Sequence, residues 1–492
     1  MAHAAKPPPP EEPGIDWRGL RQRLAAREVV EEVGFGKAQL LVLLTAGSVL
    51  FNRGVQLCLL SISTLPIAMD LGLTASQQGM LSTALLSGMF TGILVSGWCG
   101  DVAGRRFPIV VSSISTALIG CASAACGSFR WLFCARACLG FAMTLGDVSM
   151  MVLLSEVTPL KWRIPVRAAT EGIFNVGYVY AAVLAAAGDA YMRDLSWQRL
   201  TLLACAAPGA LGLCAAAFLP ESPLLLAGRG DSVGATRAFD KLRRLNRRPN
   251  ACIDVEPRGV PATARDRGRL GDSLRTVFGE RHLRTTCALA FASFALNAFY
   301  FVGAHAKRPR AASARDSGPL AGQEIFIGSP FDLVGAAVAT MLARSLPRRQ
   351  VLGLCMVAAA LSIACFGHAG PGPDRTPFLE VMYQAGLSGL YWVPTVGFVS
   401  FGQLVVDSYP TLASATGLSA ALCAGRLGAA VAPLALEHLG DLGLWQLFCY
   451  VSSALCATGA ASLCRVPPPG EPSKRAAHGV PPAGRVLSLA GT

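Results

Sequence analysis

Apolar stretches of about 20 residues recur along almost the whole chain, separated by polar connections. A helix needs about 20 apolar residues to cross a hydrocarbon core of about 30 Å, and a lipid-exposed backbone must satisfy its own hydrogen bonds. The pattern therefore predicts an all-α membrane protein with twelve transmembrane helices in two six-helix bundles. The predicted spans are 40–66, 77–98, 108–127, 131–154, 166–187, 199–219, 285–304, 324–343, 350–369, 378–404, 414–435 and 443–463.

One long polar connection, rich in Lys and Arg, separates the first six spans from the last six. The two halves echo each other, because "SEVTPLKWR" follows the fourth span and "VDSYPTLAS" follows the tenth. The predicted organisation is a cytoplasmic N-terminal tail over 1–37, a bundle over 38–226, a basic cytoplasmic central loop over 227–284, a second bundle over 285–465 and a disordered cytoplasmic tail over 466–492.

Composition and charge agree with a membrane protein. Only 15% of the residues are charged, against about 25% in a typical soluble protein, and 52% are hydrophobic. Most of the basic residues behind the net charge of +13 lie in the tails and in the even-numbered connections, so the positive-inside rule places both termini in the cytoplasm. Basic loops of this kind contact anionic lipid, and no aromatic-studded basic module points to nucleic acid.

The 16 cysteines lie almost entirely within spans and form no Cys-x-x-Cys pair, so neither a metal site nor a disulfide framework is indicated. The chain also lacks a Gly-x-x-x-x-Gly-Lys-Ser/Thr loop, a Gly-x-Ser-x-Gly elbow and a His-Glu-x-x-His motif. We therefore expect neither an enzyme nor a bound cofactor, and the expected assembly is a monomer.

An arginine, Arg53, stands in the middle of the first span. A charge near the bilayer centre costs about 2.5–3.5 kcal/mol on insertion scales, so it normally faces a partner or a wet cavity. Two readings are compatible. Arg53 forms a buried ion pair with Asp147 or Glu171, or its guanidinium clamps a carboxylate, phosphate or sulfate of a substrate. Helical spacing places Asn52, Arg53 and Gln56 on one side of the span.

Other polar and aromatic residues recur at helical spacing in the spans. Glu171 and Asn175 lie four apart in the fifth span, and Asn297 and Tyr300 lie three apart in the seventh. Tyr391 and Trp392 of the tenth span are candidates for stacking on a substrate ring, although membrane aromatics more often pack. Burial raises a carboxyl pKa and a nearby arginine lowers it, so Glu171, or Asp147, is a candidate for proton coupling, with a purely structural role as the alternative.

A set of polar residues predicts a conformational latch at the cytoplasmic ends of the helices. In "GWCGDVAGRR", Gly97 permits close helix approach, Asp101 pairs with a base or caps a helix, and Gly104 allows a tight turn. An acid and a base at the ends of neighbouring helices join them in one state of a moving protein. The further members are Arg105 and Arg106 of this loop, with Glu156, Arg163 and Asp407 of the echoed segments.

"GWCGDVAGRR" resembles the signature loop of the major facilitator superfamily, and "RACLGFAMTLG" resembles its fourth-span motif. "PESP" is similar to an element of sugar porters and organic-ion transporters. "EEVGFGKAQL" and "DSYPTLASATGLSAALCAGRLGAAVAP" resemble the synaptic vesicle 2-related branch and its metabolite-symporter relatives. The resemblance implies a cavity between two bundles, lined by the first span of each, and adds Arg136, Glu221 and Arg426 to the latch. Arg426 is alternatively a substrate anchor in the second half.

The chain departs from the pattern of this branch at several positions. Arg53 and Gln56 stand where its members tend to carry acids, Arg344 and Pro347 stand where the signature loop would repeat, and Ser414 replaces an arginine. The leading hypothesis is a secondary active transporter of a small organic solute, with an organic anion favoured and proton coupling left open, working by alternating access in a plasma or vesicle membrane. The alternative is a transporter-like binding or scaffold protein that does not transport.

Overall fold

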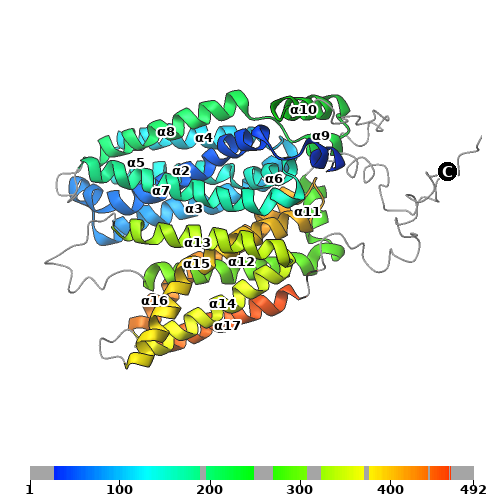
Figure 1. Cartoon of the computed structure of the whole chain (residues 1–492). Coiled ribbons are helices and arrows are strands. Elements are labelled where there is room, and N and C mark those ends of the chain that lie inside the picture. Colours follow the sequence, from blue (N-terminus) through cyan, green and yellow to red (C-terminus); the bar gives the residue numbers. More distant parts are fainter. Residues whose placement is uncertain are drawn as a thin grey trace, which may run out of the picture.

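The computed structural model describes residues 27–188, 196–248, 270–306, 323–370, 376–441, 444–464 and 466, and every regular element within them is a helix. Twelve transmembrane spans form two bundles of six (Figure 1). The N-terminal bundle comprises α2 (Lys37–Leu71), α3 (Ala75–Val102), α4 (Arg106–Ala124), α5 (Phe129–Leu145) continued by α6 (Asp147–Val157), α7 (Arg163–Gly188) and α8 (Trp197–Phe218). The C-terminal bundle comprises α12 (Glu280–Ala306), α13 (Gln323–Ser345), α14 (Arg348–Ala369), α15 (Pro377–Ser408), α16 (Ser414–Asp441) and α17 (Trp445–Leu463).

Ten of these spans are long and apolar enough to cross a membrane, judged over the described residues. The other two, α12 and α13, are 27 and 23 residues long and complete the twelve. The predicted all-α membrane fold of twelve helices in two bundles is confirmed. The tails over 1–26 and 467–492 lie outside the described residues, and the predicted domain boundaries remain predictions.

The fourth span is broken at Gly146, where α5 ends and α6 begins. Asp147 therefore occupies the first turn of a new helix, where the free N–H groups favour a negative charge. A Cβ on Gly146 would lie 2.9 Å from Ser112 of α4 and from Val49 of α2. The break thus places a carboxylate inside the N-terminal bundle, at a position packed closely by two other helices.

Small residues set the spacing between helices within a bundle. A Cβ on Gly140 of α5 would lie 2.1 Å from the carbonyl oxygen of Leu85 on α3, and a Cβ on Gly88 of α3 would lie 2.0 Å from that of Ala137 on α5. This reciprocal backbone contact is the close approach that small residues permit between membrane helices.

The connection between the bundles, expected to be a loop over 227–284, contains helical segments. They are α9 (Pro223–Gly228), α10 (Ser232–Leu245) and α11 (Leu270–Phe278), while residues 249–269 lie outside the described part. Asn246, after α10, accepts a hydrogen bond from the Ala38 amide (2.8 Å) and donates to the side chain of Gln39 (2.9 Å). The start of the first span is therefore tied to the central connection, and Figure 1 shows α9, α10 and α11 at one common end of the bundles.

Candidate functional site

Arg53 of α2 forms an ion pair with Asp147 of α6, through its Nη1 and the carboxylate Oδ2. The side chains are 12% and 1% exposed, so the pair is largely shielded from solvent. The guanidinium carbon also lies 5.4 Å from the ring centre of Phe174 on α7, within range of a cation–π contact. Asp147 and Glu171 were both predicted as partners of Arg53, and Asp147 is the one that pairs with it.

The other two polar residues of the first span contact their own bundle. Asn52 donates to the carbonyl of Ser113 on α4 (3.2 Å), and Gln56 donates to the sulfur of Cys205 on α8 (3.5 Å). Both side chains are 1% exposed. These contacts with α4 and α8 favour a structural role for both residues, and their assignment to substrate binding stays a prediction.

Arg167, which lies in the fifth span four residues before Glu171, was not among the predicted site residues. Its Nη2 is 2.8 Å from Glu171 Oε1, so Glu171 pairs with its helical neighbour, while Arg53 pairs elsewhere. A Cβ on Gly402 of α15 would lie 3.0 Å from Arg167 Nε, which places this arginine between the two bundles. A basic residue inside an otherwise apolar span was the signal that could have identified it.

Arg426 of α16 brings a third guanidinium to the same region. It lies within electrostatic range of Arg53 and Asp147 from the opposite bundle. Among the described residues it makes no hydrogen bond or ion pair. The assignment of Arg426 to the cytoplasmic latch is therefore corrected, because its electrostatic neighbours belong to the central region.

The charges of this central cluster do not balance. Three guanidinium groups stand against two carboxylates. Arg53, Arg167 and Arg426 all lie within electrostatic range of Asp147, and Arg167 also pairs with Glu171. Asp147 Oδ1 and the Nε atoms of Arg53 and Arg167 are buried without a hydrogen-bond partner among the described residues. The cluster thus holds an excess positive charge and unused hydrogen-bonding groups at the boundary of the two bundles.

The remaining predicted substrate residues are spread over both bundles. Asn297 of α12 donates to the carbonyl of Ser293 on its own helix (2.9 Å), while Tyr300, 38% exposed, stacks edge-on against Phe398 of α15 and lies within electrostatic range of Arg426. Trp392 packs against the hydrophobic core. Tyr391 and Asn175 are partly exposed. Of this group, Tyr300 is the residue that the structure brings to the central cluster.

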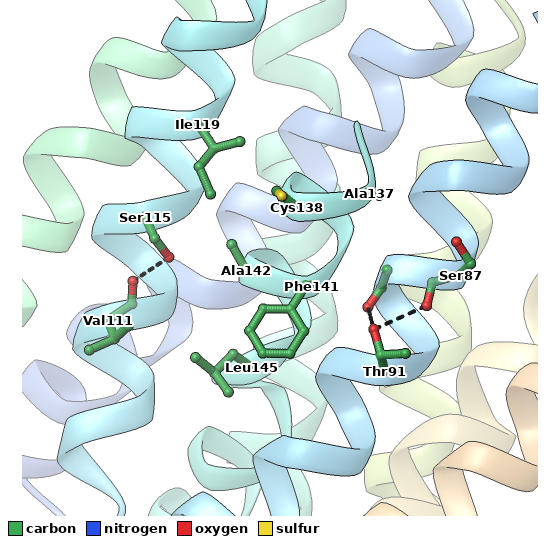
Figure 2. Close-up of a pocket in the computed structure, with 11 residues that line it drawn as sticks. Ser87, Thr91, Val111, Ser115, Ile119, Ala137, Cys138, Phe141, Ala142 and Leu145 are labelled. Carbon is green, nitrogen blue, oxygen red and sulfur yellow. Dashed lines mark hydrogen bonds between the residues drawn. The ribbon is translucent and has the colours of Figure 1, made fainter. Parts of the chain in front are cut away.

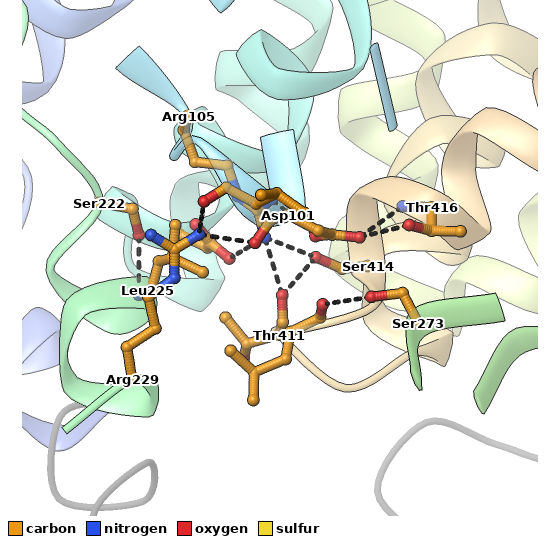
Figure 3. A network of polar contacts seen from close by, with 12 residues as sticks. Asp101, Arg105, Ser222, Leu225, Arg229, Ser273, Thr411, Ser414 and Thr416 are labelled. Carbon is orange, nitrogen blue, oxygen red and sulfur yellow. Dashed lines mark hydrogen bonds and ion pairs between the residues drawn. The ribbon is translucent and has the colours of Figure 1, made fainter. Parts of the chain in front are cut away.

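A second polar network joins the bundles at the predicted cytoplasmic end (Figure 3). Asp101, in the last turn of α3, pairs with Arg105 (2.7 Å) and accepts hydrogen bonds from the amide (2.9 Å) and hydroxyl (2.6 Å) of Thr416. Arg105 donates in turn to the carbonyl of Thr411 (2.7 Å) and to Ser414 (3.3 Å). The Asp101 carboxylate of the N-terminal bundle thereby caps the first turn of α16 in the C-terminal bundle.

Burial by itself lowers the pKa of Arg105, but the carboxylates of Glu156 (3.5 Å) and Asp101 outweigh it and raise that pKa above its usual value. Glu221 accepts from the backbone amides of Arg105 (2.8 Å) and Arg106 (3.3 Å). Arg229 donates to the carbonyl of Asp101 (2.6 Å), and burial lowers its pKa. Of the predicted latch residues in this network, Asp101 and Arg105 reach the other bundle, while the contacts of Arg106 and Glu221 lie within the N-terminal half, and the latch role of all four stays a prediction.

The echoed segments pair across the halves. Arg163 binds Asp407 (3.1 Å) of the other bundle, and Arg348 binds the second oxygen of the same carboxylate. Glu156, expected to act with Arg163, lies instead beside Arg105. Gly97 also belongs to this interface, because a Cβ there would lie 2.4 Å from that of Ser419 on α16.

Arg136 is remote from this network. It is 2% exposed in α5 and donates to the hydroxyl of Ser63 on α2 (3.4 Å). Its hydrogen bond lies inside the N-terminal bundle and involves no residue of the other one, which argues against a place in the latch.

An apolar groove of about 570 Å³ lies between α3, α4 and α5 (Figure 2). The hydroxyls of Ser87, Thr91 and Ser115 in its lining all donate to backbone carbonyls of their own helices. Because these polar groups are already bonded and the other lining groups are mostly apolar, this groove suits lipid better than a polar solute.

Comparison with known proteins agrees with this architecture. A family model described as "Sugar (and other) transporter" matches residues 67–458. The synaptic vesicle 2-related protein of Bos taurus is 25% identical over 468 residues, which cover 89% of this chain and 80% of that protein. Organic cation/carnitine transporter 7 of Arabidopsis thaliana is 24% identical over 457 residues, which cover 84% of this chain and 88% of that protein.

Among solved structures, the proton:xylose symporter XylE bound to 6-bromo-6-deoxy-D-glucose shares the fold, with a TM-score of 0.67 and 16% identity over 89% of this chain and 96% of that one. The family model covers most of the chain, including ten of the twelve spans in full and part of the first and last. The chain therefore belongs to the sugar (and other) transporter family of the major facilitator superfamily.

Proposed function

We propose that the protein is a secondary active transporter of a small organic anion, and that it works by alternating access. The observation that carries this proposal is Arg426, a guanidinium at the boundary of the bundles without a hydrogen-bond or ion-pair partner among the described residues. An unpaired charge in a membrane interior is costly, so such groups usually face a water-filled cavity or a ligand. A carboxylate, phosphate or sulfate on the solute supplies the missing partner.

The charge balance of the central cluster supports an anion over a neutral or cationic solute. Three guanidinium groups against two carboxylates leave one excess positive charge, which a monoanionic solute neutralises. The names of the relatives do not determine this property, because they refer to an organic cation and carnitine in one case and to xylose in another. The proposal rests on the residues of this chain instead.

The contacts at the predicted cytoplasmic end support alternating access. Asp101, Arg105 and Arg163 join the two bundles through side chains that separate without unfolding either bundle. Transport requires the bundles to part at one end and close at the other around a central site. Breaking these bonds together is the step that opens this end.

Proton coupling is the finer part of the proposal and depends on Glu171. Its bond to Arg167 (2.8 Å) links a titratable group to a guanidinium at the bundle boundary. An anionic solute that binds Arg167 competes for that bond and favours protonation of Glu171. We expect Glu171→Gln to abolish the dependence of uptake on a pH gradient, and unchanged pH-driven uptake in this variant would contradict the coupling.

The experiment begins with a thermal-shift screen of the purified protein against organic anions, cations and neutral sugars of similar size. A solute that binds the folded protein raises its unfolding temperature. We expect stabilisation by members of the anion group, and a loss of about tenfold to a hundredfold in apparent affinity in Arg426→Gln, which corresponds to one hydrogen bond to a charged group. Arg284→Gln alters an exposed arginine of the same bundle and serves as the matched control.

Solutes that pass the screen are then tested for uptake into proteoliposomes. Uptake that fails in Arg426→Gln and persists in Arg284→Gln supports the proposal. Stabilisation by cations or sugars alone refutes the anionic cargo. Binding without uptake of any tested solute favours the non-transporting binding or scaffold protein.

A further inference from the structure

Arg136 is a buried guanidinium that the proposed transport site does not use. It lies on α5, is 2% exposed, and its closest polar contact is the Ser63 hydroxyl at 3.4 Å. Its Nε has no hydrogen-bond partner among the described residues. The Ser63 hydroxyl already donates to the carbonyl of Leu59 (2.5 Å), so its oxygen is available only as an acceptor, and a neutral one.

Several other arginines of the described chain have a carboxylate partner, which Arg136 lacks. Arg53, Arg105, Arg163 and Arg167 each contact an aspartate or glutamate side chain. Arg136 has no such carboxylate contact within the described residues. Desolvating an ionised group without a counter-charge costs several kcal/mol, so the N-terminal bundle holds a positive charge that its own side chains leave uncompensated.

Among the described residues, the surroundings of Arg136 are closely packed and provide no carboxylate contact. The groups acting electrostatically on Arg136 are the thiols of Cys205 and Cys126, and a thiol is a weak donor. Ser63 is 1% exposed and Cys205 is 2% exposed. Leu139, on the same helix as Arg136, is fully buried. Close packing of this kind favours a single-atom anion over a branched organic one.

We propose that a chloride-sized monovalent anion binds beside Arg136, between α2, α4, α5 and α8, as a second site apart from the transported solute. Arg136 and Asp147 are separated by about three helical turns along the fourth span. The anion compensates the buried guanidinium, accepts the free Nε–H, and stabilises the N-terminal bundle. This site does not depend on what the central cluster transports.

The test compares thermal unfolding of the purified full-length protein in sodium chloride and in sodium gluconate of equal ionic strength. We expect a higher unfolding temperature in chloride, which rises with chloride concentration as expected for one bound ligand, and a similar effect of bromide. Arg136→Gln removes the chloride dependence. The control variant Arg130→Gln, which alters an exposed arginine of the same helix, retains the chloride dependence.

Two further measurements keep the proposal separate from the transport site and from folding defects. Arg426→Gln, which weakens the proposed cargo site, retains the chloride response in full. Should Arg136→Gln fail to fold, saturable binding of radioactive chloride to the native protein is the decisive measurement. Equal stability in chloride and gluconate, a response that persists in Arg136→Gln, or the absence of saturable binding overturns the proposal.

Discussion

The substitution Asp101→Asn tests the contact that joins the bundles at the predicted cytoplasmic end. Asp101 is 2% exposed and binds two partners at once, the guanidinium of its own loop and the first turn of α16. Asparagine keeps an acceptor for Thr416 but loses the negative charge that strengthens the two hydrogen bonds from Thr416. The variant therefore weakens the contact between the bundles at this end.

The size of the effect follows from the bonds that cross the boundary. The Asp101–Arg105 pair lies within one loop, whereas the amide and the hydroxyl of Thr416 both donate to the Asp101 carboxylate from the other bundle. A hydrogen bond to a charged group contributes about 1.5–3 kcal/mol and one between neutral groups about 0.5–1.5 kcal/mol, so the two bonds together lose about 2 kcal/mol. At 1.4 kcal/mol per factor of ten, the equilibrium shifts about thirtyfold toward separation of the bundles at this end.

Hydrogen exchange read by mass spectrometry measures this shift without added probes. The amide of Thr416 is bonded to Asp101, so we expect faster exchange in peptides covering residues 411–422. The matched control is Asp231→Asn, which alters a cap of α10, bonded to the Gly234 amide (2.8 Å), with no contact to the other bundle. Equal exchange in the two variants over 411–422 would refute the reasoning.

Two other predictions concern stability. Gly104 has φ +102°, and a Cβ there would lie 2.3 Å from Glu221 Oε2. Gly104→Ala should therefore lower the free energy of unfolding by about 1–3 kcal/mol, measured by thermal unfolding. Gly79→Ala, with open space around its Cβ, should leave stability unchanged, and equal losses in the two variants would contradict this prediction. Burial raises the pKa of Tyr409, whose hydroxyl shares a hydrogen bond with Thr286 (2.8 Å). The neutral Tyr409 hydroxyl therefore stabilises the folded protein below a pH of about 10, and this stabilisation is lost as the pH rises through the raised pKa. Tyr409→Phe should flatten this alkaline decline in unfolding temperature, and an unchanged slope would argue against it.

The candidate site was predictable only in part. The inward position of Arg53 follows from the cost of a charge in lipid, and Asp147 was one of two partners expected for it. Glu171 was the other, but it pairs with Arg167 four residues earlier on the same helix. Local helical spacing could have suggested this neighbour, whereas the electrostatic proximity of Arg426 to the charges of the first bundle depends on how the bundles meet.

By itself, the sequence determined the twelve apolar spans, the division into two sixes and the residues that carry charge into the membrane. These follow from hydropathy along the chain, because each span must satisfy its backbone locally whatever its neighbours are. Only the tertiary structure decided which charges meet: Arg53 and Asp147 are 94 residues apart, and Asp101 and Thr416 are 315 apart. Helix rotation and the packing of the bundles set these pairings, and left Arg136 and Arg426 without a carboxylate contact among the described residues.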